Sequence, residues 1–180
     1  MRNMHKSEMR RYMLHVWAAV AVFLLLLPTH ASAQNRNVPQ GELVSERLSS
    51  QQADFSLVRV VEGLSHPWAA AFLPDGGMLI TERPGRLLLL RGGELQKVSG
   101  LPDIYTGGQG GLLDVALHPD YTRNGLVYLT HSVSGPGGAG TALYRARLDG
   151  TQLRDGEELY RLPRLTGTRR HFGSRIVFGT

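Results

Sequence analysis

The chain has 180 residues, no cysteine and a net charge of +5 at pH 7, of which all but +2 lies in the first 33 residues. The absence of thiols excludes disulfides and cysteine-ligated zinc, iron–sulfur and haem sites. The near-neutral remainder carries scattered rather than clustered basic residues, so we expect no nucleic-acid partner.

The first 33 residues have the three parts of a secretory signal peptide. Basic residues at 2, 6, 10 and 11 precede an unbroken apolar run over 16–27, and Ala31-Ser32-Ala33 supplies a small-x-small cleavage site. An apolar run of this length rises about 18 Å as a helix, whereas a membrane span needs roughly 20 residues. We expect cleavage after Ala33, a periplasmic or secreted location and no stable membrane insertion, with an uncleaved signal anchor as the alternative.

The remainder of the chain predicts an all-β protein. Residues 34–54 are polar and are interpreted as a linker with a helical turn near 43–48. After residue 55, short β-rich runs alternate with Gly, Pro, Asp and Asn, and no helical period is found. Strands are expected at 57–62, 68–73, 78–82, 86–91, 95–99, 112–118, 126–132, 141–148 and 158–162, and a further strand begins near 174–178.

One motif occurs twice, 45 residues apart. Ala71-Phe72-Leu73-Pro74-Asp75 returns at 116–120, and each copy leads through a Gly and an apolar run to a threonine, Thr81 or Thr130. Units of four short strands with this period are typical of propeller blades. Residues 55–180 therefore predict a partial β-propeller of about two blades and the start of a third, with a β-sandwich as the alternative. Two blades alone leave an apolar face uncovered, so we expect a truncated, N-terminal part of a longer propeller.

Two segments depart from the blade pattern. In 107–111, four glycines surround Gln109, which lets backbone approach a partner closely and leaves one amide side chain to contact it. In 169–175, His171 precedes the third blade, at an end where propellers bind small molecules, and histidine accepts a proton near neutral pH. A flexible loop and a structural histidine are the respective alternatives.

The other polar candidates are interpreted as structural. Asp75 and Asp120 lie in the repeated turn, Asp114 adjoins a strand, and His118 occupies the position of Leu73 in the first copy. No group of residues has metal-ligand spacing, and no Gly-x-Ser-x-Gly elbow is present.

Several motifs together resemble the soluble PQQ-dependent aldose sugar dehydrogenases of the glucose/sorbosone dehydrogenase family. They are GLSHPWA (63–69), LPDG (73–76), LITER (79–83), GQGGLLDVA (108–116), HPDY (118–121) and HFGSR (171–175). They occur in the family's order from about residue 55 to 180. Each motif alone is weak, whereas the ordered combination is specific.

The resemblance implies a six-bladed propeller that oxidises the C1 hydroxyl of an aldose to the lactone. PQQ would accept the hydride, calcium would position PQQ, and an external acceptor would take the electrons. His171 matches the family's general base, and Gln109 matches a residue close to cofactor and sugar. The family's calcium ligands and most PQQ ligands lie on later blades, so the resemblance implies no metal site here and an inactive fragment. A non-catalytic ligand- or protein-binding propeller is the alternative, and a lactonase-like hydrolase finds no metal-binding carboxylates in the sequence.

Overall fold

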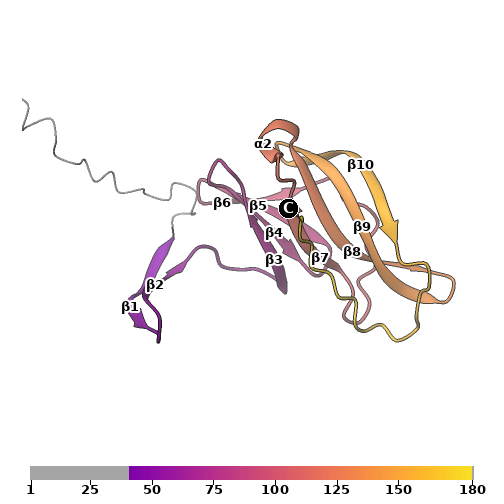
Figure 1. The fold of residues 1–180 in the computed structure, drawn as a ribbon, viewed down its shortest axis with the longest axis horizontal. Helices are drawn as coiled ribbons and strands as arrows, with labels where there is room; N and C mark the ends of the chain where they lie inside the picture. The colour runs from indigo at the N-terminus through magenta and orange to yellow at the C-terminus, as the bar shows by residue number, and fades with distance from the viewer. Residues whose placement is uncertain (1–40, 180) are drawn as a thin grey trace, which may run out of the picture. The chain divides into compact units, whose positions relative to one another are not determined.

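The computed structural model describes residues 41–179, so the expected signal peptide and the first part of the expected linker, residues 34–40, lie outside the described residues. The chain divides into two units, residues 1–34 and 35–180, and the described residues all belong to the second. They form strands and one single-turn helix (Figure 1). No helix in this described part is long and apolar enough to cross a membrane.

Two four-stranded antiparallel sheets contain most of the strands. The first has the order β3-β4-β5-β6, formed by Pro67–Phe72, Met78–Glu82, Arg86–Arg91 and Glu94–Val98. The second has the order β10-β9-β8-β7, formed by Gln152–Arg161, Gly138–Asp149, Leu126–Gly135 and Leu112–Leu117. Each sheet is a meander in which strands that follow one another in sequence are paired (Figure 1). The predicted repeat of four-stranded antiparallel units is confirmed.

The main core lies between these two sheets. Strand β7 contacts both β3 and β4, and the buried side chains of both sheets form one apolar cluster. Strands β4 and β5 are almost entirely buried, which explains why residues 78–80 and 87–90 are continuous apolar runs rather than alternating with polar residues. The core members are Leu73, Leu79, Leu87, Leu89, Val98, Leu112, Val115, Val127, Leu129, Ala146 and Leu153.

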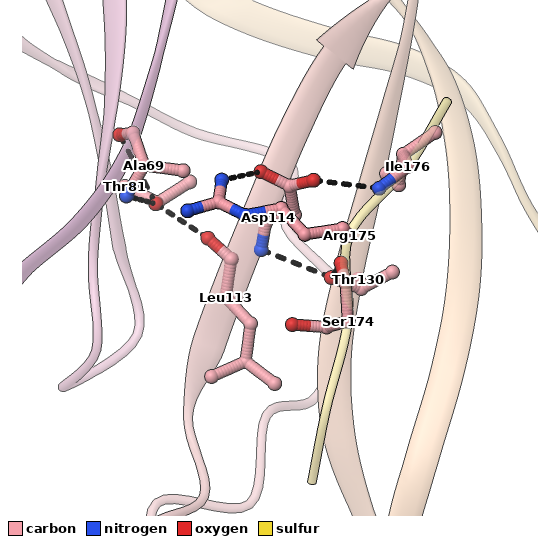
Figure 2. Close-up of polar contacts among 8 residues, drawn as sticks. All are labelled: Ala69, Thr81, Leu113, Asp114, Thr130, Ser174, Arg175 and Ile176. Carbon is pink, nitrogen blue, oxygen red and sulfur yellow. Dashed lines mark hydrogen bonds and ion pairs between the residues drawn. The ribbon is translucent and has the colours of Figure 1, made fainter. Parts of the chain in front are cut away.

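The repeated threonine of the first sheet links it to the second. Thr81, on β4, is fully buried. Its Oγ1 accepts the backbone N–H of Ala69 on β3 at 3.0 Å and donates to the backbone oxygen of Leu113 on β7 at 2.6 Å (Figure 2). The hydroxyl therefore closes the distorted β3–β4 pairing and joins it to the neighbouring sheet.

The repeated threonine of the second sheet makes the same pair of bonds one unit later. Thr130 Oγ1, on β8, accepts the N–H of Asp114 on β7 at 2.9 Å and donates to Ser174 O at 3.0 Å (Figure 2). Segment 174–178 is therefore bonded to the second sheet through Thr130, in the same way as β7 is bonded to the first sheet through Thr81. The threonine that ends each copy of the sequence motif is a polar link to the next unit.

The local predictions are wrong at three places. The expected helical turn at 43–48 is strand β1 (Glu42–Ser49), paired with β2 (Asp54–Arg59), because Ser50 Oγ accepts the Ala53 N–H at 3.1 Å and closes a hairpin turn. A single-turn helix, α2 (Tyr121–Asn124), occurs where no helix was expected, and it ends at Gly125 in the left-handed conformation. Residues 174–178 form no strand, because side chains rather than a backbone ladder hold them.

Candidate active site

The two unusual loops found in the sequence lie against each other. The backbone N–H of His171 donates to Gln109 Oε1 at 2.9 Å, and the backbone N–H of Gln109 donates to the oxygen of Arg169 at 3.0 Å. The two site candidates are 62 residues apart in the sequence. The packing of the second sheet against the first therefore brings the predicted amide and the predicted imidazole to one place.

The bond to His171 assigns a role to each half of the Gln109 amide. A backbone N–H needs an acceptor, so the side-chain oxygen of Gln109 faces the loop of His171. The Nε2 group is then the part of the amide that can donate to a ligand. The imidazole of His171 is exposed and does not take part in this bond.

A cleft of about 450 Å³ lies beside these loops and includes both candidates in its lining. Such a volume suits a small molecule. Buried Leu113 and Phe172 contribute apolar surface, whereas Arg83, Gln109 and His171 contribute polar groups. The full lining is Trp68, Arg83, Gly108, Gln109, Leu113, His171, Phe172 and Gly173.

The glycines around Gln109 are required by close backbone packing. Gly108 has a φ of +62°, and a Cβ there would lie 2.4 Å from the backbone oxygen of Arg169. A Cβ at Gly111 would lie 1.8 Å from the backbone oxygen of Arg83. The sequence suggested that these glycines allow backbone to approach a partner, and in the structure these partners are two other segments of the chain.

Arg83 and Trp68 line the cleft, although their individual positions in the site did not follow from the sequence. Arg83 Nη1 donates to the oxygen of Gly108 at 2.7 Å, and Arg83 O accepts the N–H of Leu112 at 3.2 Å. Arg83 therefore fixes the glycine loop at both ends. In the sequence, Arg83 and Trp68 were marked by their positions in the motifs LITER (79–83) and GLSHPWA (63–69).

The loop of His171 contains unusual backbone conformations. Arg169 and His171 have φ values of +55° and +62°, in the left-handed region that non-glycine residues rarely adopt. Residues in this region persist where surrounding contacts hold them, and they are concentrated at functional sites. Here the bonds between Gln109 and residues 169 and 171 supply such contacts.

The residues interpreted as structural make structural contacts. His118 Nδ1 accepts the N–H of Asp120 at 2.9 Å, and Asp75 Oδ1 accepts the N–H of Gly77 at 3.0 Å. Burial lowers the pKa of His131, a residue that is 1% exposed and whose Nε2 has no hydrogen-bond partner among residues 41–179. Within residues 41–179, no three His, Asp or Glu side chains are grouped so that they could hold a metal ion.

Comparison with known proteins assigns this arrangement to a family. Residues 64–180 match the family model of the glucose/sorbosone dehydrogenases. The chain belongs to the glucose/sorbosone dehydrogenase family. The match includes both loops of the cleft, so the inferred resemblance is confirmed at the level of the family.

Individual members of the glucose/sorbosone dehydrogenase family agree with this assignment. The chain is 42% identical to the aldose sugar dehydrogenase YliI of Escherichia coli over 142 residues, which is 75% of this chain and 38% of that protein. The crystal structure of the soluble aldose sugar dehydrogenase of E. coli in its apo form matches with a TM-score of 0.60 at 45% identity, over 64% of this chain and 35% of that chain.

A more distant structure shares the fold. The PQQ-bound aldose sugar dehydrogenase of Streptomyces coelicolor matches with a TM-score of 0.51 at 24% identity, over 71% of this chain and 36% of that chain. The chain spans about two fifths of the length of the curated relatives that it matches over most of its own length. The two sheets therefore correspond to part of a propeller-fold dehydrogenase.

Proposed function

We propose that this chain forms the N-terminal part of a PQQ-dependent dehydrogenase that oxidises the C1 hydroxyl of aldose sugars to lactones. The observation that carries the proposal is the meeting of Gln109 and His171 beside one cleft, within the segment that matches the family. The names of the E. coli and S. coelicolor relatives supply the class of substrate and the cofactor.

The cleft residues fit part of a PQQ site. PQQ is a planar, anionic quinone, and the cleft offers it a guanidinium at Arg83, an amide at Gln109 and the ring of Trp68. When bound, PQQ accepts a hydride from the sugar. The described residues do not fit calcium, because residues 41–179 contain no group of three metal-ligating side chains. We assign no step to that ion.

The role proposed for His171 is to take the proton of the C1 hydroxyl while the C1–H bond is broken. His171 is exposed and lines the cleft, and its backbone is held by Gln109, so its imidazole can meet a substrate without first breaking a hydrogen bond to another described residue. The role proposed for Gln109 is to donate from Nε2 to the sugar or the cofactor. Arg83 holds the glycine loop that carries this amide.

The test is oxidation of an aldose by the full-length protein supplied with PQQ and calcium, measured through reduction of an artificial electron acceptor. His171→Ala should lower the turnover by about 100-fold or more, since general base catalysis contributes a factor of this size. His118→Gln is the control, because that imidazole contacts the turn at Asp120 instead of the cleft. Full activity of His171→Ala would refute the proposed base, and PQQ binding without turnover in the wild type would favour a non-catalytic binding propeller.

We further propose that the protein is exported, with cleavage after Ala33. The support is the basic, apolar and small-residue order of residues 1–33. Mass spectrometry of the protein purified from its host should give an N-terminus at Gln34. An N-terminus at Met1 in the periplasmic or secreted fraction would contradict this cleavage.

A further inference from the structure

The segment after His171 is held to the second sheet by side chains. Within the described part of the chain, residues 170–179 make no backbone-to-backbone hydrogen bond. Phe172 O accepts from Thr141 Oγ1 at 2.5 Å, and Ser174 O accepts from Thr130 Oγ1 at 3.0 Å. Besides its bonds to Gln109, the loop of His171 therefore depends on a few side chains of the second sheet.

Asp114 adds a charged and buried attachment to this segment. Its side chain lies on β7 and is only 6% exposed. Oδ2 accepts the backbone N–H of Ile176 at 2.7 Å, and Oδ1 accepts Nη1 of Arg175 at 3.0 Å (Figure 2). A buried carboxylate without such donors is strongly unfavourable, so its charge favours the observed position of residues 175 and 176.

The partner of Asp114 also reaches the wall of the cleft. The guanidinium carbon of Arg175 lies 4.8 Å from the centre of the Trp68 ring, in a cation–π contact. Trp68 and His171 both line the cleft. A single carboxylate is thus connected to Trp68 through Arg175 and to the loop of His171 through the backbone of Ile176.

We infer that Asp114 is a positioning residue that holds the loop of His171 and the ring of Trp68 in the lining of the cleft. It acts through Arg175 and Ile176 and does not itself line the cleft. The inference rests on the proposed function only in treating His171 as the base. The placement of the loop can be measured without any catalytic assay.

The first test is limited trypsin digestion of the full-length protein, with cleavage after Arg169 and Arg170 followed by mass spectrometry. Asp114→Asn keeps the size of the side chain but points an amide N–H at one of the two donors. It should accelerate cleavage at these sites by about tenfold, because a buried bond to a charged group is lost. Cleavage after Arg123, on α2, should not change. The matched control is Asp149→Asn, which removes an exposed ion pair with Arg154.

A second variant keeps the test decisive if Asp114→Asn also lowers the overall stability. Arg175→Gln removes the guanidinium, whose side chain is 71% exposed, and leaves the Ile176 N–H with the carboxylate. It should accelerate cleavage after Arg169 and Arg170 by a smaller factor. Unchanged cleavage in both variants would overturn the inference.

The second test separates this inference from the proposed function. If the wild type oxidises aldoses, Asp114→Asn should lower kcat by about tenfold and change KM by less than about threefold, since a misplaced base slows the chemical step. An unchanged kcat would overturn the positioning role. If the wild type has no such activity, the proposed function fails, while the digestion still decides whether Asp114 holds the loop.

Discussion

Replacement of Thr81 by valine tests the polar link between the two sheets. The change keeps the shape of the side chain, so no large cavity is expected. It removes the hydroxyl that accepts the Ala69 N–H at 3.0 Å and donates to Leu113 O at 2.6 Å, at a residue with no exposed surface. Each buried polar group that loses its partner costs about 1–3 kcal/mol. With two groups affected, we expect a loss of about 2–6 kcal/mol in the free energy of unfolding.

The measurement is urea and thermal unfolding of the full-length protein, followed by circular dichroism. A loss of this size corresponds to a decrease in Tm of roughly 4–24 °C for a domain of 150–250 residues, and to less for a larger one. Thr81→Ser keeps both hydrogen bonds and should cost about 1 kcal/mol. Thr122→Val, at an exposed position of α2, should change the stability by less than about 0.5 kcal/mol. A loss in Thr81→Val no greater than in these two controls would refute the reasoning.

The same substitution in the second repeat should act on a different segment. Thr130→Val removes the bond to Ser174 O, and residues 174–178 belong to no strand. We expect faster hydrogen exchange of the Ile176 amide, whose N–H donates to Asp114 Oδ2, and a smaller loss of global stability than in Thr81→Val. Equal exchange in Thr130→Val and the wild type would contradict the assignment of this threonine as a link.

Two further predictions concern the glycine loop and the buried histidine. Gly108→Ala should lower the activity of the full-length protein by about tenfold or more, because its Cβ would lie 2.4 Å from Arg169 O. Gly92→Ala, with a similar φ of +60° and open space around it, should cost only about 1 kcal/mol of stability and no activity. Burial lowers the pKa of His131 below its usual 6.5, so the unfolded chain binds more protons and the free energy of unfolding should fall as the pH falls below 6.5. His131→Phe should reduce this dependence, and an identical pH profile in a series of urea titrations would contradict it.

Local patterns predicted the strands well where burial is one-sided or complete. The apolar runs of β4 and β5 and the turn at Pro74–Gly77 were all found in the expected places. The helical turn at 43–48 was wrong because its polar sequence gives no period, and pairing with β2 decides its conformation. The strand at 174–178 was wrong because an apolar run does not reveal whether a backbone ladder or side chains will bind it.

The sequence by itself determined the all-β class, the four-strand repeat and the identity of Gln109 and His171 as candidates, because these depend on local periodicity and on short motifs. Only the tertiary structure decided that the two candidates meet, since their contact depends on loops 62 residues apart brought together by the packed sheets. The tertiary structure also changed the interpretation of the glycines around Gln109 and of Asp114. The glycines around Gln109 make room for the backbone of Arg83 and Arg169, and Asp114 is a buried anchor for the loop of His171. Such roles are set by which segments pack together, and residue type and spacing along the chain do not specify them.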